Sequence, residues 1–256
     1  MKKLLAAICV LLAGIIFVGC GEQSFDSVPY TTNFNDAPTI SAALESYNAA
    51  RLSNQQLLTA AAEYTTEQVV TDHGVTTKTT TITKIGSKSK GAYIQITNIT
   101  YGENGEQFYT TTTWYNGIQY DEDVNGNIST GTYSTDNNNL LLSQNFSALL
   151  PTAFIVQNFD IGYTKSFSNT SYYKLCIASS LNSSLSFINK QIGFPDSSPY
   201  INFFNYEFGV NTKGYLQMFR TYYKAVDRTQ ATVYIYESTT TLTSYGSSDM
   251  LPPDPV

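Results

Sequence analysis

Two hydrophobic periods alternate along this chain, and the first to appear is helical. Apolar residues recur every three or four positions from Ile40 to Tyr47, directly after Asp36 and Pro38. Aspartate is a favourable N-cap, and proline is tolerated in the first turn of a helix. The spacing therefore predicts one amphipathic helix that starts at Asp36 and ends near Leu52.

A second helical segment carries no charge. The chain is rich in leucine from Leu140 to Leu150, and no charged residue follows until Asp160. Pro151 interrupts the run, so a helix of about three turns followed by a bend is predicted. An uncharged helix must be covered on most sides, and we expect it to plug the concave face of a sheet. A further short helix is predicted over 181–192.

Elsewhere the period is two residues, which is typical of strands. Val75 to Ile85 alternates with threonine, and Asn-Gly pairs at 104–105, 116–117 and 125–126 mark tight hairpin turns. Three long alternating segments, 200–210, 215–226 and 231–245, close the chain. The pattern predicts two β-meanders within one domain, separated by the uncharged helix.

The first twenty residues have the anatomy of a secretory signal peptide. Lys2 and Lys3 precede an apolar run that ends in Gly19-Cys20. This junction is similar to bacterial lipoprotein signals, in which the cysteine receives diacylglycerol. A transmembrane helix and an ordinary signal with a coincidental cysteine are the alternatives. We predict a signal over 1–19, lipidated Cys20 with a flexible tether over 20–37, one domain over 38–246 and a disordered tail over 247–256.

Composition limits the classes of partner. Charged residues make up 13% of the chain, which has 20 tyrosines and a net charge of −6. Loss of Lys2 and Lys3 with the signal takes the charge to −8. Such a protein has no electrostatic footprint for nucleic acid or anionic lipid. We expect attachment to the extracytoplasmic face of the cell membrane through the lipid on Cys20, because two acyl chains give stable anchoring.

The residues that usually carry chemistry are scarce. His73 is the only histidine, and it lies in a predicted turn beside Asp72. Once Cys9 leaves with the signal and Cys20 carries lipid, only Cys176 remains as a thiol. Neither an ordinary zinc site nor a Ser-His-Asp triad can be assembled from this set. The remaining acidic clusters lie at hairpin turns, so we expect no enzyme, no metal and no cofactor.

Two short motifs point to a family. They are the hairpin Trp114-Tyr115-Asn116-Gly117-Ile118-Gln119-Tyr120 and the turn Val210-Asn211-Thr212-Lys213-Gly214-Tyr215-Leu216. With the order of predicted elements, they resemble the LolA/LppX-like superfamily of bacterial envelope lipoproteins and lipoprotein carriers. The resemblance implies an α+β fold, mainly antiparallel β, in which an incomplete (half) β-barrel wraps round one to three helices. It also implies a hydrophobic cavity between sheet and helices, where members bind acyl chains or lipids.

The leading expectation is a membrane-anchored, non-catalytic lipoprotein that binds a lipid or another amphipathic ligand in this cavity. A surface carbohydrate- or protein-binding module and a passive structural envelope lipoprotein are the alternatives. The candidate ligand-binding residues are apolar or aromatic side chains of the strands and the uncharged helix: Trp114, Tyr120, Leu142, Phe146, Leu149 and Tyr206.

Overall fold

The computed structural model describes residues 25–102, 104–151, 159–177 and 200–254. The chain divides into two compact units, residues 1–30 and 31–256. In the first unit, Phe25–Ser27 form one 3-10 turn, η1. The predicted signal, Cys20 and the predicted helix over 181–192 lie outside the described residues.

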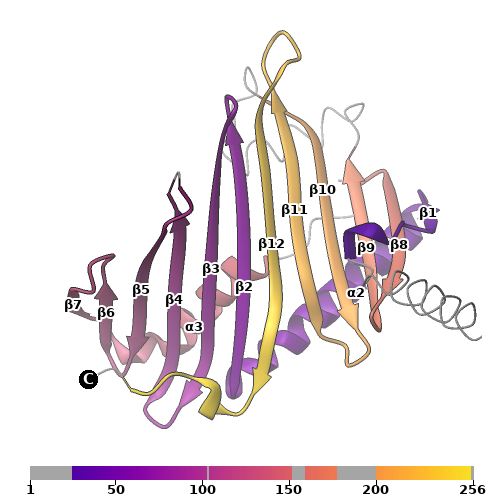
Figure 1. Ribbon diagram of the computed structural model, residues 1–256. Helices are drawn as coiled ribbons and strands as arrows, with labels where there is room; N and C mark the ends of the chain where they lie inside the picture. Colours follow the sequence, from indigo (N-terminus) through magenta and orange to yellow (C-terminus); the bar gives the residue numbers. More distant parts are fainter. Residues whose placement is uncertain (1–24, 103, 152–158, 178–199, 255–256) are drawn as a thin grey trace, which may run out of the picture. The chain divides into compact units, whose positions relative to one another are not determined.

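The second unit is built on one antiparallel sheet of 12 strands (Figure 1). The first meander contains β2 (Ala61–Asp72), β3 (Val75–Lys88), β4 (Gly91–Tyr101), β5 (Gln107–Tyr115), β6 (Ile118–Glu122) and β7 (Ile128–Thr132). The second contains β8 (Ile161–Phe167), β9 (Thr170–Ile177), β10 (Tyr200–Asn211), β11 (Leu216–Val226) and β12 (Thr232–Gly246). Strand β12 pairs with β2 and joins the two meanders into one sheet. The sheet is open, with β7 at one edge and the short β1 (Thr32–Phe34) at the other.

Tight turns hold neighbouring strands in register. The β5–β6 hairpin turns at Asn116 and Gly117, whose φ angles are 53° and 80°. Both angles lie in the left-handed region, which glycine and asparagine adopt most readily. The two-residue loop pairs Tyr115 with Ile118 and therefore Trp114 with Gln119.

Two helices lie on one face of the sheet (Figure 1). Helix α2 spans Ala37–Gln56, and Asp36 caps it by accepting a hydrogen bond from the Thr39 amide at 2.9 Å. Helix α3 spans Asn138–Leu149. Short 3-10 turns precede β2 (η2, Leu57–Thr59), precede α3 (η3, Thr135–Asn137) and follow β12 (η5, Ser248–Met250). In the described ranges, no helix is both long enough and apolar enough for a membrane span.

We call the face that packs against the helices the inner face and the opposite one the outer face. The core lies between the inner face and the helices. Tyr47 of α2 is fully buried there, with its ring centroid 5.3 Å from that of Phe208 and 5.6 Å from that of Phe219. The prediction of a mainly antiparallel, open β structure with helices against it is confirmed.

Both ends of the predicted domain are more ordered than the sequence pattern indicates. Within the predicted tether, Thr32–Phe34 form β1 and pair with β8. Phe34 packs against the core, whereas Thr32 and Asn33 remain exposed. Within the predicted disordered tail, Leu251 is buried beside Tyr93 and Tyr115. Residues 248–254 therefore belong to the fold, whereas 255–256 lie outside the described part.

Candidate functional site: a pocket on the inner face

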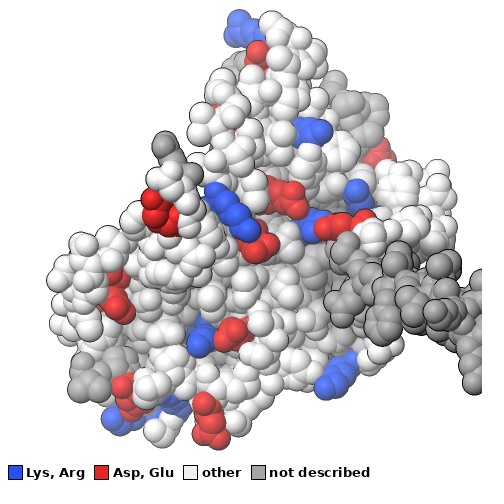
Figure 2. Space-filling view, in the orientation of Figure 1, with Lys and Arg blue, Asp and Glu red and all other residues white. Residues whose placement is uncertain are grey.

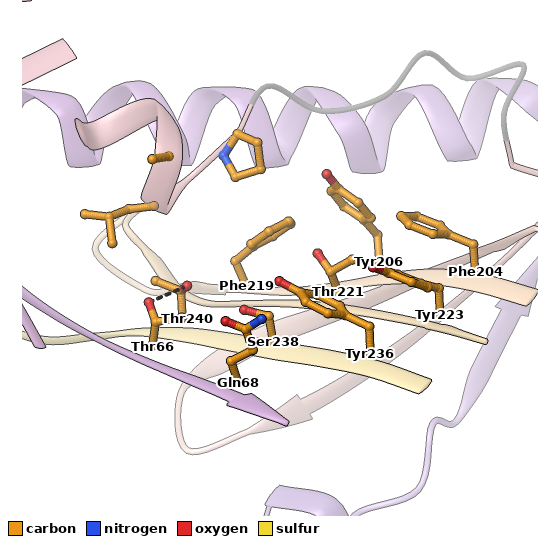
Figure 3. Close-up of a pocket in the computed structure, with 13 residues that line it drawn as sticks. Thr66, Gln68, Phe204, Tyr206, Phe219, Thr221, Tyr223, Tyr236, Ser238 and Thr240 are labelled. Atoms are coloured by element: carbon orange, nitrogen blue, oxygen red, sulfur yellow. Dashed lines mark hydrogen bonds between the residues drawn. The ribbon is translucent and has the colours of Figure 1, made fainter. Parts of the chain in front are cut away.

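A pocket of about 550 Å³ lies between the inner face and the end of helix α3 (Figure 3). Its floor comes from four neighbouring strands, β10, β11, β12 and β2. Its roof comes from Ala148 and Leu149 at the end of α3 and from Pro151 just beyond. The floor residues are Thr66, Gln68, Phe204, Tyr206, Phe219, Thr221, Tyr223, Tyr236, Ser238 and Thr240.

Strand register arranges the floor in rows, because side chains opposite each other on paired strands share a face. One row is aromatic: Phe204 pairs with Tyr223, which pairs with Tyr236. The Tyr223 and Tyr236 rings stack with centroids 4.8 Å apart and planes 13° apart. The Phe204 and Tyr223 rings are also nearly parallel, at 6.3 Å and 12°. This end of the pocket thus has a flat aromatic floor.

The next row is polar. Tyr206 pairs with Thr221, Thr221 with Ser238, and Ser238 with Gln68. Each of these side chains carries a hydroxyl or an amide and none carries a charge. Figure 3 shows them on the floor of the pocket below the roof residues. A ligand here meets aromatic carbon and neutral hydrogen-bonding groups side by side.

The third row closes the pocket beneath α3. Phe219 pairs with Thr240, and Thr240 pairs with Thr66. The hydroxyl oxygens of Thr66 and Thr240 are 2.9 Å apart and hydrogen-bond to each other (Figure 3). The Phe219 ring meets the Tyr206 ring edge-on at a centroid distance of 4.8 Å. These contacts fix the side chains of the row against one another.

Helix α2 holds the roof in place. The last carbonyls of a helix have no partner within it and need one from elsewhere. Arg51 of α2 donates from Nε to the Leu150 carbonyl at 2.5 Å, and its guanidinium lies 5.2 Å from the centre of the Phe146 ring. The Tyr47 hydroxyl donates to the carbonyl of Pro151. The end of α3 is therefore fixed over the floor by two side chains of α2.

Burial favours the neutral form of two phenols of the pocket, Tyr206 and Tyr223. It raises the pKa of Tyr206 well above the ordinary value, and nearby Tyr47 adds to the rise. Burial is also the largest cause of the raised pKa of Tyr223, followed by Tyr234 and Tyr236. At physiological pH these hydroxyls retain their protons and remain available as donors as well as acceptors.

Of the six candidate residues, Leu149 and Tyr206 line the pocket. Phe146 lies deeper, 1% exposed, with Leu142 and Trp114 packed against the same core. None of these three is among the described residues that line the pocket. Trp114 donates from Nε1 to the Gln119 side chain at 3.0 Å.

The sixth candidate residue, Tyr120, lies on the outer face and does not line this pocket. Trp114 pairs with Gln119 across the hairpin, so Tyr120, one residue further, projects to the opposite face. There it helps to line a separate hollow of about 240 Å³ on the outer face. Its neighbours are Tyr93, Gln95, Thr111, Thr113, Glu122, Ile128, Pro252, Pro253 and Asp254.

Most residues of the pocket floor were not predicted as ligand-binding residues. Phe204 and Tyr223 are recognisable as strand aromatics, but the sequence does not show which strands become neighbours. Gln68 and Ser238 look like ordinary polar positions until the pairing of β2 with β12 brings them together. The one sequence feature that could have located part of the floor is the two-residue period of the strands. It places Tyr234, Tyr236 and Ser238 on one face of β12.

The groups expected to be unreactive lie away from the pocket. His73 sits in the β2–β3 turn, with Nδ1 2.6 Å from Oδ1 of Asp72, and both side chains are exposed. Cys176 is buried on β9, and burial raises the pKa of its thiol to about 11. No group of three or more His, Cys, Asp or Glu suited to a metal ion occurs among the described residues.

No protein-family model and no curated protein matches this chain. Rv2717c from M. tuberculosis matches in structure at 7% identity, over 77% of this chain and 99% of that one, with a TM-score of 0.25. A domain from Vibrio parahaemolyticus, named for outer membrane lipoprotein sorting, matches at 6% identity, over 86% and 96%, with a TM-score of 0.25. The dehydratase domain of the CurK module of curacin polyketide synthase matches at 11% identity, over 86% and 85%, with a TM-score of 0.15. At these TM-scores the matches assign neither a family nor a function to this chain.

Proposed function

We propose that this chain is a non-catalytic lipoprotein, anchored at the extracytoplasmic face of the cell membrane, that binds an amphiphile in the inner-face pocket. The observation that carries the proposal is the pocket itself. It combines Leu149, Pro151 and aromatic rings with neutral hydroxyl and amide groups, within a volume that suits a small ligand or part of an acyl chain.

The pocket supports binding rather than catalysis. No histidine, cysteine, lysine or carboxylate is among its described lining residues. General acid–base catalysis needs a titratable group near the operating pH, and the pKa values of the Tyr206 and Tyr223 phenols are shifted further away from it. Apolar contact and neutral hydrogen bonds are what the lining offers to a ligand.

A binding test uses an environment-sensitive fluorescent fatty acid and two tryptophan variants on β12. Ser238→Trp places a large ring in the middle of the pocket floor, whereas Thr241→Trp places the same ring on the outer face. We expect the parent chain and Thr241→Trp to bind the probe and Ser238→Trp to lose most of the signal. Equal binding by both variants would show that the probe lies elsewhere.

The anchor is tested separately through the cysteines. We expect the full chain, expressed in bacteria fed with labelled palmitate, to incorporate the label and to lose it in Cys20→Ser. Cys176→Ser is the matched control, because Cys176 is buried on β9 and should leave labelling unchanged. Label that survives Cys20→Ser would contradict lipidation at this position.

A carbohydrate-binding role on the outer face is the second candidate. It is favoured by the hollow that Tyr120 shares with Gln95, Thr113 and Glu122, which offers an aromatic ring beside hydrogen-bonding groups. Glycan-array binding that disappears in Tyr120→Ala and persists in Ser238→Trp would support this candidate over the inner-face pocket.

A further inference from the structure

Charge is segregated between the two faces of the sheet. The register directs every lysine and arginine of the described strands to the outer face. These seven residues are Lys78, Lys84, Lys88, Lys165, Lys174, Arg220 and Lys224. Figure 2, which views the face opposite the helices, shows Lys and Arg side chains interspersed with Asp and Glu. The ion pair of Arg220 with Glu207, at 3.4 Å, is one example.

The inner face is nearly neutral by comparison. Among the described strands, only Asp72 and Asp121 are charged and project inward. Asp72 ends β2, Asp121 lies on β6 near the sheet edge, and neither lines the pocket. On the helices above, Arg51 is the one cation in the described ranges, and its Nε is engaged by the Leu150 carbonyl.

The polar part of the pocket continues across the inner face. From Gln68 and Thr66, the register leads to Thr79 and Thr81 on β3 and then to Asn98 on β4. Thr81 donates to the Asn98 side chain at 2.9 Å. All five side chains are partly exposed. Hydroxyl and amide groups thus form a neutral polar strip that begins at the aromatic floor.

We propose that the bound amphiphile carries an uncharged, hydroxyl-rich headgroup, a sugar on an acylated glycerol, and that this headgroup lies on the neutral polar strip. The inference rests on the proposed function, since it specifies the ligand of the same pocket. A phosphate placed on this strip would lose water without gaining a cation from the described strands, which is costly for a charge. Sugar hydroxyls both donate and accept, so threonine, serine and glutamine side chains suit them, and tyrosine rings suit the apolar side of a sugar ring.

The experiment compares three probes with identical acyl chains: diacylglycerol, glucosyl-diacylglycerol and phosphatidylglycerol. Each competes with a fluorescent fatty acid for the chain from Gly21 onward, at low and at physiological salt. We expect the glucosyl lipid to bind at least about tenfold more tightly than phosphatidylglycerol. Its affinity should also be insensitive to salt, because no ion pair forms.

Two double variants locate the headgroup. Gln68→Leu with Ser238→Ala removes polar groups from the strip, and we expect it to weaken glucosyl-diacylglycerol binding about tenfold while leaving diacylglycerol binding within about twofold. Thr65→Val with Thr241→Val is the matched control on the same two strands, because this pair faces outward and should alter neither ligand.

The outcomes separate the two proposals. Phosphatidylglycerol binding as tightly as the glucosyl lipid, or the two double variants behaving alike, would overturn the sugar-headed ligand and leave amphiphile binding intact. Failure of all three lipids to displace a bound fluorescent fatty acid would likewise overturn the sugar-headed ligand, whereas failure of the fatty acid itself to bind would contradict the proposed function.

Discussion

Asn54 connects helix α2 to the sheet through both ends of its side-chain amide. Its Oδ1 accepts from the Leu216 amide and its Nδ2 donates to the Leu216 carbonyl, each at 2.9 Å. Nδ2 also lies 3.3 Å from the Tyr64 hydroxyl. Asn54 is fully buried, and it continues the stripe of Ile40, Tyr47 and other core residues on α2. The polar Asn54 therefore lies on the apolar stripe of α2 because it makes these specific hydrogen bonds to β11.

We expect Asn54→Leu to lower the free energy of unfolding by about 3 kcal/mol, because it leaves the buried backbone groups of Leu216 without their partner. Asn48→Leu, on the exposed side of the same helix, should change it by less than about 0.5 kcal/mol. Urea unfolding followed by circular dichroism measures both values. Similar stability of the two variants would show that the Asn54 contacts contribute little.

The buried phenol of Tyr64 predicts how stability depends on pH. Burial raises its pKa from 10.0 to about 12. The unfolded chain therefore loses this proton at a lower pH than the folded chain does, so the stability contribution is complete below pH 10 and disappears as pH rises toward 12. We expect the free energy of unfolding to be level from pH 7 to 9 and to fall steeply above about pH 10. Tyr64→Phe should reduce the slope, and an unchanged slope would contradict the assignment.

At the scale of elements, the C-terminal residues 248–254 lie against the outer face, and we call them the strap. Lys88 of β3 donates to the Asp254 carboxylate at 3.0 Å and also to the carbonyl of Pro252. Its ammonium lies 4.5 Å from the centre of the Tyr93 ring. The hydrogen bond from Lys88 is the largest cause of the lowered pKa of Asp254. Lys88 thus holds the end of the described chain, and Lys90 lies 3.8 Å from the same carboxylate.

We expect Lys88→Met to release this strap while the sheet stays folded. Hydrogen exchange should show loss of protection around Met250 and Leu251, with β2 and β12 unaffected. Lys84→Met is the control, because Lys84 projects from the same strand and face and pairs with Glu63 at 3.6 Å instead. Equal protection of the C-terminal segment in both variants would contradict the role of Lys88.

Local elements were predictable from the sequence, and their long-range pairing was not. Helix α2, helix α3 and the hairpin at Asn116-Gly117 follow from spacing and turn residues within a few positions. Thr66 and Thr240, in contact across the pocket floor, are 174 positions apart, and no local pattern pairs them. The face of Tyr120 was available from the two-residue turn, because it pairs Trp114 with Gln119. The ordered segment 248–254 was not predicted, because its proline-rich composition is typical of disorder. The contact with Lys88, far away in the sequence, could not be seen from that composition.

At the scale of the whole molecule, the charge distribution and the pocket distinguish the inner face, which we propose as the binding face, from the outer face. The outer face carries the cations of the described strands, mostly close to carboxylates (Figure 2). The inner face packs against the helices through an apolar core, and its part of the pocket floor carries no charged side chain among the described lining residues. This division suits a protein whose binding surface is internal and whose exposed surface remains soluble next to a membrane.

Native mass spectrometry of the chain from Gly21 onward, secreted by bacteria and purified without detergent, tests the central claim most directly. We expect a second species that is heavier than the polypeptide by the mass of one acylated lipid. That species should be depleted in Ser238→Trp and retained in Thr241→Trp. A parent chain that carries only its polypeptide mass, and stays so after incubation with lipid vesicles, would contradict amphiphile binding in the inner-face pocket.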